Sequence, residues 1–146
     1  MSSVPAEPPF RLFNLQDQVS LDIDYIREAV KRAIPQCVEQ ALTESPLVDL
    51  EHIEISIVSG AELSGVHEKF LDDPTATDVI TFDHGEIIAS ADMAQEKASG
   101  LGHSTEFELL LYVIHGLLHL GGYNDKSDRE FKEMSAVQER IWKNSC

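Results

Sequence analysis

Basic residues are scarce in this sequence. Lys and Arg number 11 against 26 Asp and Glu, which gives a formal net charge of -15. A surface of that sign repels nucleic acid at long range, so the composition argues against a general nucleic-acid binder. It does not exclude a metal-assisted nuclease, because a bound divalent cation and a few well-placed basic side chains can hold a single phosphate group.

The sequence also lacks a disulfide framework, a long apolar run and a signal-peptide pattern. Its two cysteines are Cys37, within a predicted helix, and Cys146, the last residue. Two cysteines placed in this way indicate a reducing compartment. No stretch approaches the roughly 20 apolar residues that cross a bilayer, and the first nine residues are not basic and then apolar. We therefore expect a cytoplasmic protein that has no membrane partner.

The length fits a single domain. With 146 residues, 42% of them hydrophobic, the chain can bury a substantial core, but it is too short for two independent domains. Residues 1–9 (MSSVPAEPP) are rich in proline and show no periodicity, so we expect a disordered N-terminal head. A single domain over 10–146 is the expected organisation.

Predicted strands and helices are interleaved along the chain. Ile53, Ile55 and Ile57 alternate with polar residues, which predicts a half-buried strand over 52–58. The other predictions for this part of the chain are a first strand from Phe10, a helix from Leu21 to Ala41 that Pro35 kinks or breaks, a short helix over 60–71, strands over 77–82 and 85–90, a helix over 91–97, and turns at 72–74 and 83–85.

The most apolar helix is predicted over 107–120. Thr105 followed by Glu108 is typical of a capping box, and the residues that follow are apolar on nearly every side, so this helix belongs in the middle of the domain. A glycine pair ends it. Ser127 begins a second capping box and a final helix that extends through Trp142.

Two histidines on the central helix are candidate metal ligands. His115 and His119 are four residues apart, so both imidazoles can point at one spot. A third ligand cannot come from the same helix face, because the glycine pair ends the helix. Gly122 permits a turn with positive φ, and Asp125 can then return its carboxylate to the pair. Three protein ligands and an open position are typical of catalytic zinc.

A structural interpretation of the same residues stays open. Two histidines at helical spacing can be hydrogen-bonded core residues, and Asp125 can cap the last helix. Burial of both imidazoles without a metal or a polar partner costs free energy, which favours the metal site. Gly116 occupies the position of the general-base glutamate in HExxH peptidases, so that route to peptide hydrolysis is not expected. We also expect Gly116 to clear space near the metal for a bulky substrate.

The segment over 115–125 (HGLLHLGGYND) resembles the HGxLHLxGYDH signature of the YbeY endoribonuclease family. Its spacing through Gly122 is also similar to that of metzincin peptidases. Upstream, the segment 77–82 (TDVITF) resembles the family's TDVLSF strand, and 85–87 resembles the start of its GDI strand. The resemblance covers most of residues 50–143.

This resemblance implies a fold, an activity and partners. The fold would be α+β, with a small mixed sheet packed against a central metal-binding helix and flanking helices. The activity would be that of a hydrolase: a zinc-dependent, single-strand-specific endoribonuclease that acts in ribosomal RNA maturation and ribosome quality control. One Zn²⁺ per chain would be held by His115, His119 and Asp125. The partners would be single-stranded ribosomal RNA and, in addition, ribosomal or ribosome-associated proteins.

The sequence departs from the family pattern at three positions. Asp125 replaces a third histidine, which lowers the charge of the site by one and should make the metal a weaker Lewis acid. Leu71 stands where the family has an arginine in the substrate cleft, with Lys69 as a candidate substitute. His67 replaces an asparagine in the same segment.

The catalytic groups are left open. A metal-bound water is the expected nucleophile. His67 is a candidate to contact that water or the substrate, and Tyr123 can either donate to the substrate or merely pack. His52, His84 and His103 are not assigned to the site. Two alternatives remain: a diverged metal-dependent hydrolase of another substrate, such as an amide or a small phosphoester, and a non-catalytic ribosome-associated binding module in which the metal only stabilises the fold.

Overall fold

The computed structural model describes residues 7–71 and 77–146, so the turn predicted at 72–74 lies outside the described residues. In chain order the elements are β1 (Phe10–Asn14), α1 (Ile23–Gln40), the 3-10 helix η1 (Pro46–Asp49), β2 (Ile53–Val58), α2 (Gly60–Leu71), β3 (Val79–Phe82), β4 (Glu86–Ser90), α3 (Ala91–Leu101), α4 (Thr105–Leu120) and α5 (Asp128–Ser145). Only η1 was not predicted.

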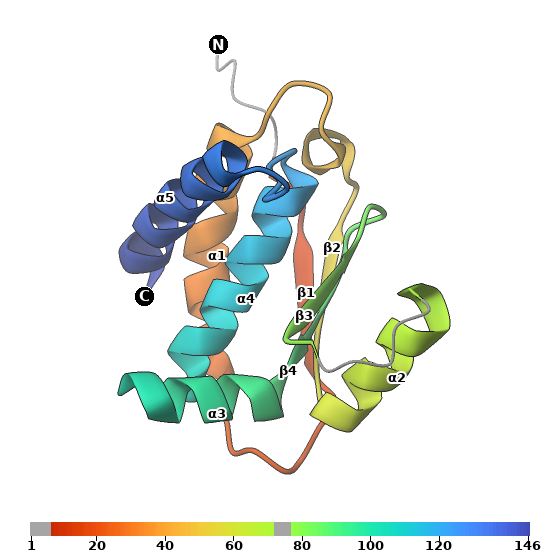
Figure 1. Cartoon of the computed structure of the whole chain (residues 1–146), viewed down its shortest axis with the longest axis vertical. Helices are drawn as coiled ribbons and strands as arrows, with labels where there is room; N and C mark the ends of the chain where they lie inside the picture. Colours follow the sequence, from red (N-terminus) through yellow and green to blue (C-terminus); the bar gives the residue numbers. More distant parts are fainter. Residues whose placement is uncertain (1–6, 72–76) are drawn as a thin grey trace.

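The strands within the described residues form one mixed sheet. Its order is β1-β2-β4-β3, with β1, β2 and β4 parallel and β3 antiparallel to β4. Strands β1 and β3 are therefore the edges. Figure 1 shows the sheet between α2 on one side and α1, α4 and α5 on the other. This arrangement confirms the predicted α+β class with a small mixed sheet beside a central helix.

The core lies mainly between the sheet and α4. Fully buried residues of β2, such as Ile55 and Ile57, share one apolar cluster with Leu110, Ile114 and Leu117 of α4. A smaller cluster on the opposite face of the sheet joins Val58, Leu63, Ile80 and Ile88 beneath α2. Helix α4 is thus held rigidly, and it carries both candidate histidine ligands.

The cap of α4 differs from the prediction. Ser104, and not Thr105, is the N-cap residue: it has extended backbone angles, and its hydroxyl accepts a hydrogen bond of 3.1 Å from the N–H of Phe107. Glu108 does not complete a capping box, because its carboxylate contacts His103 instead. The second predicted cap is confirmed, since the Ser127 hydroxyl accepts from the N–H of Glu130 at 3.2 Å.

Pro35 does not break α1, which continues from Ile23 to Gln40. A proline within a helix removes one hydrogen bond and costs about 3 kcal/mol. Ile34, Cys37 and Val38, which flank Pro35, are all buried in the core, and their packing offsets that cost. Of the two predicted effects of Pro35, the break does not occur, because tertiary packing outweighs local propensity.

Two other boundaries differ from the prediction. The helix predicted over 91–97 extends to Leu101, where Gly102 ends it in the left-handed conformation with φ +75°. Of the head predicted over 1–9, residues 1–6 lie outside the described part of the chain. Pro8 is buried, and the carbonyl of Pro9 accepts a hydrogen bond of 2.8 Å from Ile53, so the end of this segment packs against the start of β2.

None of the described helices combines the length and the apolar character needed to cross a membrane.

Candidate metal centre

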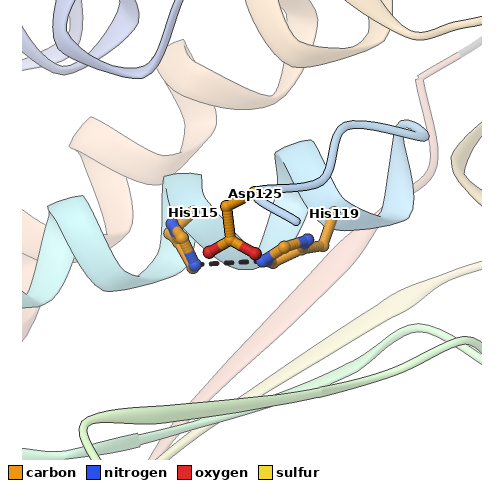
Figure 2. A group of neighbouring side chains, drawn as sticks. All are labelled: His115, His119 and Asp125. Carbon is orange, nitrogen blue, oxygen red and sulfur yellow. Dashed lines mark hydrogen bonds between the residues drawn. The ribbon is translucent and has the colours of Figure 1, made fainter. Parts of the chain in front are cut away.

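The two candidate histidine ligands face each other. They lie one turn apart on α4, and their Nε2 atoms are 3.0 Å from one another, with the rings nearly perpendicular at 87°. Figure 2 shows His115 and His119 side by side on the same face of the helix, with the Asp125 carboxylate pointing into the gap between them. The helical spacing read from the sequence therefore produces the expected convergence.

Hydrogen bonds at the other ring nitrogens fix the tautomers. His119 Nδ1 lies 3.0 Å from the carbonyl oxygen of Tyr123, which only accepts, so this nitrogen carries the proton. His115 Nδ1 lies 2.7 Å from Oε1 of Gln138 on α5 and donates to it in the same way. Both Nε2 atoms are then unprotonated, and two lone pairs face each other without a donor between them.

This arrangement fits a bound cation. Two imidazole nitrogens, each about 2.0–2.1 Å from one tetrahedral zinc ion, are about 3.3 Å apart, close to the separation observed here. Burial lowers the pKa of His119, and the neighbouring His115 lowers it further, so the neutral form that a metal needs is favoured.

Asp125 completes the group from the loop after α4. One ligand atom from each of His115, His119 and Asp125 lies within 4.8 Å of the other two, so the three residues can hold a metal ion. Gly122 makes the turn with φ +95°, as predicted, and its N–H donates to the carbonyl of His119 at 3.0 Å. Asp125 is exposed, which leaves one side of the group open to solvent.

The group opens into a cleft of about 390 Å³. The cleft lies at the β3 edge of the sheet, between the end of α2 and α4, and is lined by His67, Leu71, Val79, Ile80, Thr81, Asp83, His115 and His119. Leu71, at the position of the family arginine, therefore does face the cleft. Among the described residues, no Lys or Arg lines it.

Gly116 does not clear space for a substrate, contrary to the prediction. A Cβ atom at this position would lie 2.7 Å from Oγ1 of Thr81 and 3.1 Å from two side-chain carbons of Ile87. Gly116 thus allows α4 to approach the sheet closely. The glutamate of an HExxH peptidase could not enter this contact without moving the helix, which strengthens the case against that mechanism.

The two candidate contributors lie in different places. His67 lines the cleft, as a residue that contacts substrate or metal-bound water must. The ring of Tyr123 packs against the main core, and its contribution to the site is the backbone carbonyl that orients His119.

Gln138 was missed by the sequence analysis. It lies on α5, four residues after the buried Met134 and three before the buried Ile141, so it belongs to the inward-facing stripe of that helix. A lone amide on such a stripe was the available signal, because a buried polar group needs a partner.

The remaining histidines lie outside the metal group. His52 lines a separate pocket at the β1 edge, with Arg11 and Glu54. His84 stacks on Phe82 with ring centroids 5.5 Å apart, and His103 pairs with Glu108. These three histidines were not assigned to the site from the sequence, and within the described residues none of them joins it.

The fold and this group define a small α+β protein with a candidate mononuclear metal centre of two histidines and one carboxylate, built at the end of a buried helix. The comparison with protein families then identifies the chain. The model of the family "Endoribonuclease YbeY" matches residues 12–145, so the chain belongs to the YbeY family, as the resemblance predicted.

Similar proteins agree with this assignment. An endoribonuclease YbeY of Beutenbergia cavernae is 30% identical over 133 residues, which cover 80% of this chain and 87% of that protein. One from Koribacter versatilis is 35% identical over 95 residues, and the match spans only 61% of that relative's length. A solution structure of a Thermotoga maritima protein superposes with a TM-score of 0.61 at 25% identity, covering 92% of this chain and 90% of the other.

Proposed function

We propose that this protein is a zinc-dependent, single-strand-specific endoribonuclease that acts in ribosomal RNA maturation and ribosome quality control in the cytoplasm. One observation carries the proposal: two unprotonated Nε2 atoms and a carboxylate converge at the wall of an open cleft. The name of the family supports RNA as the substrate. Ribosomal RNA, with ribosomal or ribosome-associated proteins as further partners, is the finer part of the proposal.

In this proposal, His115, His119 and Asp125 would hold one Zn²⁺. Such an ion would supply the Lewis acidity that activates a water molecule and offsets negative charge on the phosphate. Gln138 and Tyr123 keep the two imidazoles in the tautomer that presents Nε2 to the ion. The open side of the cleft admits a strand that is not paired with another.

Two of the departures from the family pattern, at Asp125 and Leu71, make the site less positively charged. The Asp125 carboxylate lowers the net charge of the metal group by one, compared with three neutral histidines, and so weakens it as a Lewis acid. Leu71 supplies no positive charge to the cleft, and Asp83 adds a negative one. Phosphate attraction within the described cleft lining therefore depends on the cation.

The lack of positive charge in the described cleft lining favours the alternative of a metal-dependent hydrolase that acts on another substrate. A cleft without Lys or Arg among its described lining residues suits a neutral substrate, such as an amide, at least as well as a phosphodiester. The other alternative, a non-catalytic ribosome-associated module, makes the metal purely structural. In that case its removal should unfold the domain, whereas removal from a catalytic site should abolish activity first.

The test combines elemental analysis with a cleavage assay. Wild-type protein should contain about one zinc per chain and cleave single-stranded RNA, while a matched duplex should resist. His119→Ala should lose both zinc and cleavage. His52→Ala, an exposed histidine outside the metal group, should keep both. If wild-type protein with a full complement of zinc does not cleave RNA, the nuclease proposal fails and the two alternatives remain.

A further inference from the structure

Three rings form a row on the surface beside the cleft. Phe70 from the end of α2, Phe82 from the end of β3 and His84 from the turn after it are in contact in that order. The Phe70 and Phe82 rings meet edge to face with centroids 5.7 Å apart. Phe82 and His84 are stacked at 5.5 Å with 14° between their planes. We call these three residues the aromatic strip.

The aromatic strip adjoins the cleft at two points. Leu71, the chain neighbour of Phe70, lines the cleft, and so does Asp83, which lies between Phe82 and His84. Because side chains alternate along a strand, Phe82 points away from the face that carries Thr81, toward the apolar cluster beneath α2. The strip therefore begins at the rim of the cleft and follows the β3 edge of the sheet.

The two ends of the aromatic strip are exposed, whereas its centre is anchored. Phe82 packs against the cluster around Ile80 and Ile88. Phe70 is 59% exposed, and the side chain of His84 is 70% exposed. An isolated exposed aromatic residue needs no explanation. Two exposed rings that flank a third, packed one, next to a candidate catalytic cleft, form a surface on which flat ring systems can stack.

Charge decides which part of a nucleic acid this region can bind. The chain carries a net charge of -15, and no Lys or Arg is found among the described residues that line the cleft. Contacts to phosphates are correspondingly poor, whereas stacking does not depend on charge. One cation adjoins the strip: the Nζ of Lys69 lies 5.4 Å from the centre of the Phe70 ring.

We infer that the aromatic strip binds unpaired bases of a single-stranded RNA whose backbone passes the metal group, so that the substrate is held by its bases more than by its phosphates. The inference rests on the proposed function and deepens it. It also supplies a physical reason for single-strand specificity, because bases within a duplex are already stacked on their neighbours and cannot reach the rings.

Binding can be measured without cleavage. Fluorescence anisotropy of the full-length chain in EDTA would compare a labelled 12-nucleotide single strand with an abasic ribose-phosphate oligomer of equal length. We expect the abasic oligomer to bind at least about tenfold more weakly, because stacking on an aromatic side chain is lost for each missing base. The affinity for the normal strand should fall only shallowly with salt.

Variants locate the effect. Phe70→Ala should weaken binding of the normal strand about tenfold, His84→Ala should weaken it by less, and Phe70→Tyr should restore it by supplying another ring. The matched control is Phe131→Ala, which removes a phenylalanine of similar exposure, 57%, from α5. Circular dichroism would verify that each variant is folded.

Two results would overturn the inference: equal binding of the abasic and normal oligomers, or equal effects of Phe70→Ala and Phe131→Ala. In either case, the exposed rings would be better explained as a contact surface for a protein partner. The proposed function fails separately. If binding does not depend on the bases but RNA is still cleaved, the role of the aromatic strip is refuted and the proposed nuclease function stands. If binding depends on the bases but the zinc-loaded protein does not cleave RNA, the role of the strip stands and the nuclease function is refuted.

Discussion

Helix α4 has a cluster that contains histidine near each end, and the two clusters differ in how the ring nitrogens of their histidines are satisfied. Before the N-terminus of α4, His103 Nε2 lies 2.7 Å from a carboxylate oxygen of the buried Glu108, and its ring meets Phe107 and Trp142 edge-on. Near the C-terminus, the Nε2 atoms of His115 and His119 lie 3.0 Å apart, and neither has another hydrogen-bond partner among the described residues.

The difference separates a structural histidine from a ligand. Both clusters are partly buried, so burial alone does not distinguish them. His103 has a carboxylate partner that satisfies it with no added ion. In the other cluster, each Nδ1 is already used and two lone pairs remain unmatched, a condition that one divalent cation resolves. We therefore expect substitutions in the two clusters to have different consequences.

The largest effect on zinc binding is expected from substitution of the candidate ligands themselves. His115→Ala should abolish stoichiometric zinc binding, because two remaining ligands do not make a site of three. His103→Ala should retain about one zinc per chain. Elemental analysis after exhaustive dialysis measures both. Equal zinc loss in the two variants would contradict the claim that His115 is a metal ligand and His103 a structural residue.

The next effect concerns the residue that orients a ligand. Gln138→Leu removes the acceptor for His115 Nδ1–H and should weaken zinc binding about 10- to 100-fold. Gln138→Glu keeps an acceptor at that position and should retain affinity closer to that of the wild type. A competition titration with a chromophoric chelator gives the affinities. The ¹⁵N shifts of the metal-free His115 ring should report a mixed tautomer only in Gln138→Leu.

A smaller effect, on stability alone, is expected at the structural cluster. His103→Ala leaves the Glu108 carboxylate, which is 3% exposed, without its partner. The free energy of unfolding should fall by about 2 kcal/mol. Urea denaturation measures the change, with the exposed His52→Ala as a control that should stay within about 0.5 kcal/mol of the wild type. No loss of stability in His103→Ala would mean that the pair is not structural.

The smallest effect is expected in the cleft. Leu71→Arg adds a positive charge among the lining residues and should steepen the dependence of single-stranded RNA binding on salt by about one phosphate contact. The affinity should rise a few-fold at low salt. Leu71→Gln, a polar substitution without charge, should not change the salt dependence. An unchanged slope in Leu71→Arg would place this side chain away from the path of the RNA.

Local patterns in the sequence predicted the features that depend on neighbouring residues. The spacing of His115 and His119, the turn at Gly122 and the return of Asp125 all follow from helical periodicity and from the backbone freedom of glycine. The alternation of isoleucines likewise predicted β2.

Features that depend on contacts between distant elements were missed. Gln138 reaches His115 from another helix, and Gly116 is required by Thr81 and Ile87 on the sheet, so no local pattern specifies either role. The break expected at Pro35 does not occur for the same reason, since core packing around α1 outweighs the local cost of a proline.

The central claim, that His115, His119 and Asp125 form one metal site, is tested most directly by Asp125→Ala beside the matched control Asp128→Ala. Both substitutions remove one carboxylate, but Asp128 lies in the first turn of α5, outside the metal group. Elemental analysis of the two dialysed proteins should find zinc lost from Asp125→Ala and about one zinc per chain in Asp128→Ala. Stoichiometric zinc in Asp125→Ala would contradict the site described here.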